Sequence, residues 1–200
     1  MPMPQHLDKS LEQLKELVCS IHSFSKEEWE EFSALWKPHS AKRKEILTHP
    51  GEVERYLYFV VEGIQRVVYM DEQGREATLV FTYAPSFGGV LDSMLEGVSS
   101  HYFYETLSPS AFLRVSISDL QKQGQHLKAI ESLIQKGLVG ALSGVLERLV
   151  EVQCYSSEER FRSLLKRSPH ILQRVPHKYL ANYLGIDATN FSKLLNKVKL

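Results

Sequence analysis

Residues 176–195 read PHKYLANYLGIDATNFSKLL and contain the strongest structural signal in the chain. Pro176 suits the first turn of a helix, and Gly185 suits a left-handed turn that ends it. Asp187 can cap a second helix directly after that turn. The residues predicted to face inward are Leu180, Ala181 and Leu184 in the first helix and Phe191, Leu194, Leu195 and Val198 in the second. Two helices joined by so short a turn are typical of a helix-turn-helix.

The outward side of the second helix carries short hydrogen-bonding side chains and lysines, which suit the grooves of double-stranded DNA. Asn190 and Lys193 are predicted to contact base edges, because Asn can bond adenine in two places and Lys reaches the acceptors of guanine. Thr189, Ser192 and Lys197 are predicted to contact phosphates. The complete set of predicted DNA-binding residues is Ala188, Thr189, Asn190, Ser192, Lys193, Lys197 and Lys178.

The distribution of charge supports this prediction although the formal net charge is zero. From Arg160 to the C-terminus the chain has nine basic residues and one acidic residue, a net charge of +8, so the remaining residues carry −8. A basic tail on an acidic body favours binding to phosphates, because the counterions that they release supply much of the affinity. The alternative is a helical hairpin that serves only for packing.

The N-terminal part predicts two helices followed by antiparallel strands. Residues 7–24 repeat apolar side chains at helical spacing, and Ser25 with Glu28 forms the capping-box pattern of a second helix that Pro38 would end. From about Lys42 to Leu120, short β-rich runs alternate with turn residues, as in a small roll or barrel. Strands are predicted at residues 56–61, 66–70, 76–81 and 111–115.

A long helix is predicted between the roll and the helix-turn-helix, since apolar residues recur every three or four positions from Leu127 to Val152. It would be about 40 Å long at the usual rise per residue, and a small roll cannot cover its whole apolar stripe. We therefore predict a two-fold homodimer, with the alternative that the helix lies along its own domain. The predicted dimer interface consists of Leu127, Ile130, Ile134, Leu138, Ala141 and Val145.

The predicted fold class is α+β, with an N-terminal jelly-roll-like antiparallel β-roll, a long dimerisation helix and a C-terminal helix-turn-helix. The predicted domains are a β-roll sensor domain with the N-terminal helices at 1–124, the dimerisation helix at 125–155 and the helix-turn-helix DNA-binding domain at 156–200.

Several other classes of function lack support in the sequence. Cys19 and Cys154 lie far apart without a CxxC motif, so we expect free thiols, no metal site and no catalytic residues. A metal-dependent enzyme on a cupin-like roll needs clustered histidine and carboxylate ligands. The only histidines in residues 42–120 are His49 and His101, with no HxH motif and no carboxylate at a matching spacing. The N-terminus lacks a secretion signal, and the longest uncharged run in the helical part, residues 137–146, is half as long as a membrane span. We expect a cytoplasmic protein that is not an enzyme and has no membrane partner.

With a roll, a long helix and a helix-turn-helix in that order, the chain resembles the Crp/Fnr family of transcription regulators. The residues that carry the resemblance are Leu47, Gly51-Glu52, residues 58–66 (YFVVEGIQR), Gly74-Arg75-Glu76, and the motif from Leu180-Ala181 to Ser192-Lys193. The resemblance covers nearly the whole chain. It implies a cyclic-nucleotide-binding-like roll, a homodimer whose recognition helices lie about one DNA turn apart, and contact with RNA polymerase.

The departures from the family concern the effector. Family members that bind cyclic AMP carry a Gly-Glu pair for the ribose and an Arg-Ser or Arg-Thr pair for the cyclic phosphate. Here Val90 stands near the Glu position and His101-Tyr102 near the second pair, so the phosphate-binding cassette is degenerate. A neutral histidine does not reproduce the bidentate grip of a guanidinium, and we expect no conventionally bound cyclic nucleotide. The candidate pocket for a small-molecule effector consists of Gly88, Gly89, Val90, His101 and Tyr102, and no cofactor is assigned.

A second departure is that the chain stops at Leu200, soon after the recognition helix, so a helix-turn-helix without the usual β-hairpin wing is expected. The predicted function is a homodimeric, DNA-binding transcription regulator of the Crp/Fnr type with an unknown effector. The alternative is a ligand-sensing module that regulates another protein through protein–protein contact, without specific DNA binding.

Overall fold

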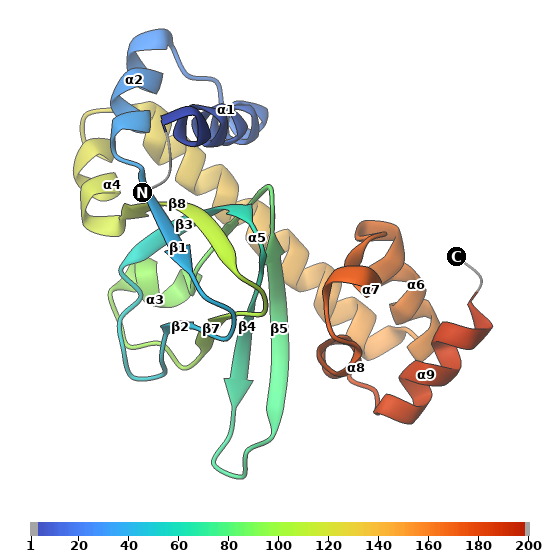
Figure 1. Cartoon of the computed structure of the whole chain (residues 1–200). Coiled ribbons are helices and arrows are strands. Elements are labelled where there is room, and N and C mark those ends of the chain that lie inside the picture. The colour runs from blue at the N-terminus through green and yellow to red at the C-terminus, as the bar shows by residue number, and fades with distance from the viewer. Residues whose placement is uncertain (1–3, 199–200) are drawn as a thin grey trace.

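The computed structural model describes residues 4–198. Two N-terminal helices and a β-roll lie at one end, the long helix α5 (Lys128–Cys154) runs past the roll, and a C-terminal helical unit lies beside its far end (Figure 1). The roll, the long helix and the C-terminal helices follow one another in the predicted order. The predicted α+β fold class is therefore confirmed.

The N-terminal helices are α1 (Pro4–Ile21) and α2 (Lys26–Ala34). The predicted capping box is present at the start of α2. The Ser25 hydroxyl accepts a hydrogen bond from the Glu28 backbone N–H at 3.2 Å, and the Glu28 carboxylate accepts one from the Ser25 backbone N–H at 2.7 Å. Phe32 of α2 and Leu14 of α1 are fully buried in one core with the roll. A local capping signal thus starts a helix that the core then holds in place.

The roll consists of two four-stranded antiparallel sheets, with strand orders β1-β8-β3-β6 and β2-β7-β4-β5. Its strands are β1 (Lys37–Ala41), β2 (Ile46–Thr48), β3 (Tyr56–Glu62), β4 (Ile64–Met70), β5 (Glu76–Tyr83), β6 (Ser86–Gly88), β7 (Phe103–Thr106) and β8 (Ser110–Ser116), with the short helix α3 (Leu91–Glu96) between β6 and β7. Strands β3, β4, β5 and β8 were predicted. Pro38 does not end the second helix but lies in β1, an edge strand, where a missing N–H is tolerated.

Gly63 carries the chain from one sheet to the other. Strand β3 ends at Glu62 in the first sheet, and β4 begins at Ile64 in the second. Gly63 has a φ of +94°, and a Cβ atom at this position would lie 2.7 Å from the Pro109 carbonyl oxygen. Both the backbone conformation and the close approach of the loop before β8 therefore require glycine here.

Helices α4 (Ile117–Gly124) and α5 follow β8. The first two turns of α5 belong to the core of the roll, because Ile130 and Leu133 cluster with Leu120 of α4 and Val18 of α1. Among the described residues, α5 is the one helix that is long and apolar enough to cross a membrane, judged by length and composition alone. One such helix is weak evidence for a membrane span, and the start of α5 is packed inside the protein.

The C-terminal unit contains α6 (Ser157–Arg167), α7 (Ile171–Arg174), α8 (His177–Leu184) and α9 (Ala188–Lys197). The largest buried side chains of its core are Phe161, Leu180, Leu184 and Phe191. The same core includes Ile64 and Leu107 of the roll. The unit therefore packs directly on the roll as well as on α5.

Replacing Gly63 by alanine should destabilise the fold more than the same change at Gly51. Both glycines have a positive φ, but a Cβ atom at Gly51 would meet nothing within 4 Å. We expect the free energy of unfolding to fall by about 3 kcal/mol for Gly63→Ala, from backbone strain and overpacking together, and by about 1 kcal/mol for Gly51→Ala, from strain alone. Urea titrations measure both values, and equal losses would contradict the close approach at Gly63.

Candidate nucleic-acid interface

Helices α8 and α9 have the geometry that the motif predicts. Gly185 ends α8 in the left-handed conformation, with φ 67° and ψ 39°. The Ile186 backbone N–H then donates to the Ala181 carbonyl at 3.0 Å, which closes the turn. Asp187 caps α9, since its side chain accepts a hydrogen bond from the Asn190 backbone N–H at 2.8 Å. The chain thus turns within three residues and starts a second helix at a fixed position.

The predicted DNA-contacting residues of α9 lie on its solvent side. Phe191 and Leu194 face inward and are 1% and 6% exposed. The other side of α9 carries the exposed Ala188, Thr189, Ser192 and Lys193 and the half-buried Asn190. Lys178 is exposed in the first turn of α8, with its Nζ 4.5 Å from the centre of the Tyr179 ring. Helix α9 therefore presents a polar surface with the basic side chain of Lys193 to solvent.

Lys197, by contrast, is engaged within the chain. Its Nζ lies 2.6 Å from a carboxylate oxygen of Glu158 in α6, and Glu158 also binds Arg162 at 2.8 Å. Hydrogen bonds from Lys197 and Arg162 hold the pKa of the Glu158 carboxyl below its ordinary value. A DNA phosphate would have to compete with Glu158 for Lys197. Lys197 was predicted to contact a phosphate, and its partner Glu158 lies two residues before the basic tail that starts at Arg160.

The buried carboxylate of Glu151, which is 4% exposed, attaches the C-terminal unit to α5. It accepts hydrogen bonds from Arg167 at 2.6 and 3.1 Å, from Ser163 at 2.5 Å and from Arg148 at 3.0 Å. Arg148 also donates a hydrogen bond to the Tyr183 backbone carbonyl. Its guanidinium stacks on the Tyr183 ring, with 4.2 Å between Cζ and the ring centre. Although burial raises the pKa of Glu151, these hydrogen bonds outweigh it, and the pKa lies below its usual 4.5. The Glu151 carboxylate thus joins α5 to α6 directly, and Arg148 extends the network to α8.

Aromatic side chains fill the interior of the roll, near part of the predicted effector pocket. Tyr104 is fully buried, and its hydroxyl lies 3.0 Å from Thr82 Oγ1. The ring centres of Tyr58 and Phe112 are 5.3 Å apart, and those of Tyr58 and Tyr104 are 5.7 Å apart. A Cβ atom on Gly88 would lie 3.0 Å from Cζ of Tyr104, so Gly88 makes room for that tyrosine. Burial raises the pKa of Tyr58 and Tyr104, which keeps both phenols neutral.

The other predicted effector residues have different surroundings. Gly89 has a φ of +125°, and Val90 is 2% exposed in the core of the roll. His101 is exposed, and the half-buried Tyr102 packs near Tyr69 with 6.5 Å between ring centres. A cavity of about 480 Å³ lies elsewhere, between α3, α4 and the start of β3, and none of the five predicted residues lines it.

The predicted dimer residues divide between the core and the surface. Ile130 is fully buried in its own chain, and Leu127 and Ile134 pack against the same core. Ile130 therefore has no surface to offer to a partner, because the first turns of α5 lie on α1 and α4. Leu138, Ala141 and Val145 are exposed. The apolar residues of α5 that are 38% to 61% exposed are Leu138, Val139, Leu142, Val145, Leu146, Leu149, Val150 and Val152.

The groups that could bind a metal or react as nucleophiles are dispersed. Within residues 4–198, no group of three or more His, Cys, Asp or Glu side chains is placed to hold a metal ion. Cys19 and Cys154 are exposed free thiols, as predicted.

No protein-family model and no curated protein sequence matches the chain. Its fold is similar to that of FixK2 from Bradyrhizobium japonicum, with a TM-score of 0.74 and 18% identity over 81% of this chain and 83% of that one. The c-di-GMP-responsive global regulator CLP from Xanthomonas campestris matches with a TM-score of 0.63 and 18% identity, over 84% and 88% of the two chains. The catabolite activator protein of Thermus thermophilus matches with a TM-score of 0.55 and 18% identity, over 88% and 84%.

The fold is therefore a β-roll that one long helix joins to a helix-turn-helix. The same fold occurs in a putative transcriptional regulator of the Crp/Fnr family from Eubacterium rectale and in a cyclic-nucleotide-binding domain from Methylobacillus flagellatus. At these identities the likeness establishes the fold.

Replacing Glu151 by glutamine should weaken the attachment of the C-terminal unit in a pH-dependent way. We expect a loss of about 3 kcal/mol at pH 7, because two arginines lose a buried partner. The pKa of Glu151 is lower in the folded state, so its contribution is fully present above the ordinary value of 4.5 and is lost as the pH falls through the folded pKa. The difference between wild type and Glu151→Gln should therefore shrink below pH 4.5.

Urea titrations at neutral pH and at a pH below the folded pKa measure this difference. Glu131→Gln is the control, because Glu131 is exposed on the same helix, near its other end. A loss in Glu151→Gln that stays constant with pH would contradict an attachment through the charged carboxylate.

Proposed function

We propose that this chain is a homodimeric, DNA-binding transcription regulator of the Crp/Fnr type. The observation that carries the proposal is the solvent side of α9, where hydrogen-bonding side chains and a free lysine lie in a part of the chain with a net charge of +8. Two structural neighbours are named as a global regulator and a putative transcriptional regulator, and a third is named as a catabolite activator protein. These names support a regulatory role for this chain. The positive field of the tail would draw the chain to phosphates, and the side chains of α9 would then select the sequence.

In this proposal the first half of α9 enters the major groove. Asn190 bonds an adenine edge, and Lys193 reaches the acceptors of guanine. The methyl group of Ala188 suits contact with a thymine methyl, while Thr189 and Ser192 bind phosphates beside the groove. Lys178 adds a phosphate contact from the first turn of α8. The Asp187 cap and the buried Phe191 keep the helix at a constant angle, so that these contacts form together.

A second copy of the chain is the proposed cover for the exposed face of α5. Leu138, Leu142, Val145, Leu149 and Val152 recur at alternating intervals of four and three residues. This is the spacing of the contact positions in a two-stranded coiled coil. All five side chains are between 38% and 60% exposed, so they are available to a partner. The proposed interface therefore begins at Leu138, after the turns of α5 that the roll covers, and includes the predicted Leu138 and Val145.

The remaining parts of the proposal concern the cellular context. The chain acts in the cytoplasm, where DNA and RNA polymerase are its partners, and it has no enzymatic activity. Its effector is not a cyclic nucleotide held by the family's cassette. The buried Val90 has no carboxylate for a ribose, and the exposed His101 has no guanidinium for a cyclic phosphate. Gly88 supports the same view, since the space beside it is taken by Tyr104.

The Lys193→Ala variant tests DNA reading. A binding site selected by the wild type from random-sequence DNA is titrated by fluorescence anisotropy at several salt concentrations. We expect wild-type affinity to fall steeply with salt, and Lys193→Ala to weaken specific binding about 5- to 150-fold, as for the loss of one base contact. Asn190→Ala should in addition relax the preference for one base.

The matched control is Lys122→Ala, which removes the same charge from an exposed position on α4, far along the chain from the motif. It should change the affinity less than twofold. If the selection enriches no sequence and the wild type does not bind DNA even at low salt, the regulator proposal fails. The alternative function, contact with another protein, would then take its place.

The double variant Leu142→Glu and Leu149→Glu tests the homodimer. Two carboxylates on an apolar seam repel their copies in the partner and lose solvation, so we expect a monomer in sedimentation and at least a 100-fold loss of affinity for a two-half-site operator. Gly144→Glu is the control, since a Cβ atom there meets nothing within 4 Å and helical spacing places it away from the seam. A double variant that remains dimeric would contradict the proposed seam.

A further inference from the structure

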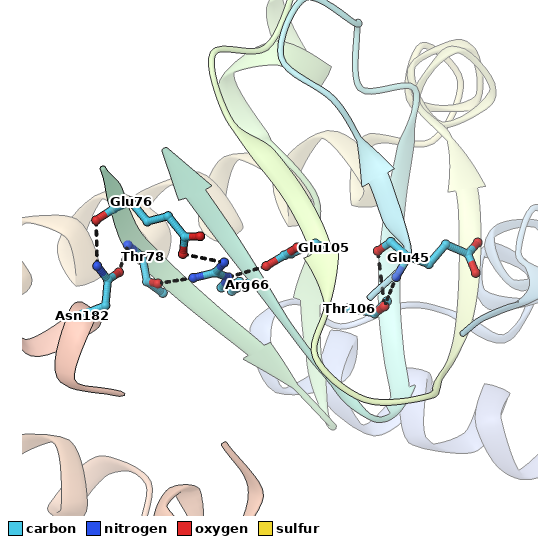
Figure 2. A network of polar contacts seen from close by, with 7 residues as sticks. All are labelled: Glu45, Arg66, Glu76, Thr78, Glu105, Thr106 and Asn182. Atoms are coloured by element: carbon cyan, nitrogen blue, oxygen red, sulfur yellow. Dashed lines mark hydrogen bonds and ion pairs between the residues drawn. The ribbon is translucent and has the colours of Figure 1, made fainter. Parts of the chain in front are cut away.

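Helix α8 is attached to a free sheet edge of the roll. Strand β5 is the last strand of its sheet, so the backbone groups on its outer side have no neighbouring strand. Asn182 of α8 takes the place of such a strand. Its Oδ1 accepts a hydrogen bond from the Thr78 N–H at 2.6 Å, and its Nδ2 donates one to the Glu76 carbonyl at 2.7 Å (Figure 2). A single side-chain amide thus pairs with the strand as a peptide group would.

The side chains of the same two β5 residues bind Arg66 of β4, which is 3% exposed. Its guanidinium donates to Thr78 Oγ1 at 3.0 Å and lies 2.8 Å from the Glu76 carboxylate and 2.5 Å from the Glu105 carboxylate of β7 (Figure 2). Five donors in a rigid plane allow one arginine to hold three partners at once. Arg66 therefore links β4, β5 and β7 at the point where α8 is attached.

A second contact joins α8 to the same arginine. The ring of Tyr179 lies over the Arg66 guanidinium, with 4.2 Å between Cζ and the ring centre. Tyr179 and Asn182 are three residues apart, so they lie on one face of α8. The helix thus touches Arg66 directly through Tyr179 and indirectly through Asn182 and the backbone of β5.

We propose that this cluster couples the state of the roll to the position of the helix-turn-helix. We call it the edge latch, and it consists of Arg66, Glu76, Thr78, Glu105, Tyr179 and Asn182. A shift of β7 relative to β4 moves Glu105, changes the grip on Arg66 and so disturbs the surface on which Tyr179 stacks. Because α8 and α9 share one core, α9 follows α8. The attachment stands on its own contacts, whereas its role in regulation rests on the proposed function.

The contacts of the latch suit a connection that can open. Asn182 is half-buried, and Thr78 is 6% exposed while α8 covers it. Once α8 moves away, water can bond the Thr78 N–H and the Glu76 carbonyl at the free edge of β5, so that opening leaves neither group unpaired. Arg66 behaves differently, because its side chain is 4% exposed and needs its carboxylates in either state. Opening therefore separates α8 from β5 while the network inside the sheet persists.

Hydrogen exchange of the Thr78 amide in the full-length protein without DNA tests the latch. In Asn182→Ala this amide loses its partner, and we expect its exchange to become about tenfold faster, as for the loss of one to two hydrogen bonds. The Val67 amide in β4, a strand paired on both sides, is the internal reference and should keep its rate. Asn196→Ala is the matched control, since Asn196 is exposed on α9.

The coupling is tested from inside the roll with Glu105→Gln. If the roll controls α8 through Arg66, this change should speed exchange at Thr78 and in α8 at least threefold, and its effect should not add to that of Asn182→Ala. Glu62→Gln, an exposed position at the end of β3, should leave both rates unchanged.

Unchanged exchange at Thr78 in Asn182→Ala would overturn the edge pairing. If Glu105→Gln leaves the exchange rate of the Thr78 amide unchanged, the coupling is overturned. Neither readout uses DNA, so the two proposals can fail separately. Normal DNA binding with unchanged exchange refutes the latch alone, whereas the expected exchange without DNA binding refutes the proposed function and supports the latch.

Discussion

Glu151 fixes the position of the C-terminal unit on the long helix. A carboxylate that is 4% exposed is costly unless its partners surround it, and Arg148 and Arg167 do so from α5 and α6. Sliding α6 along α5 by one turn would separate Arg167 and Ser163 from Glu151 and leave the buried carboxylate with Arg148 alone, so the observed arrangement is favoured. The rings of Phe161 and Phe191, 5.6 Å apart, then tie α9 to α6. The Glu151 network thus helps to set the orientation of α9 relative to α5.

Aromatic, aliphatic and polar side chains pack together in the interior of the roll. Tyr104, Thr82 and Gln65 form a buried neutral chain in which Thr82 lies 3.0 Å from Tyr104 and 2.9 Å from Gln65. Such a chain is self-sufficient, because its polar atoms pair with one another. Gly88 lies beside this chain, and the Tyr104 hydroxyl leaves no space for a side chain at position 88. In the proposed regulator, a change in the roll would reach the C-terminal unit through the sheets.

The features that were predicted from the sequence have local causes. The capping box at Ser25 and the left-handed Gly185 involve residues within a few positions of each other. The β-rich composition of β3, β4 and β5 and the turn residues between them are likewise local. The features that were missed depend on distant partners. Asn182 bonds Thr78 across 104 positions, and nothing in its own helix indicates a sheet edge. Ile130 was assigned to the dimer because helical spacing shows an apolar side without showing whether a core or a second chain covers it.

The contact between the roll and the C-terminal unit combines an apolar part with a polar part, and the two differ in the cost of opening. The Phe81 ring packs 5.2 Å from the Tyr183 ring, and Ile64 lies in the same core as Leu180. Full separation would expose this surface to water at about 25 cal/mol per Å². Opening at the edge of β5 exchanges the hydrogen bonds of Asn182 for bonds to water and ends the stacking of Tyr179 on Arg66. In the proposed coupling α8 would therefore turn about its apolar contact and carry α9 with it, while the two parts stay joined.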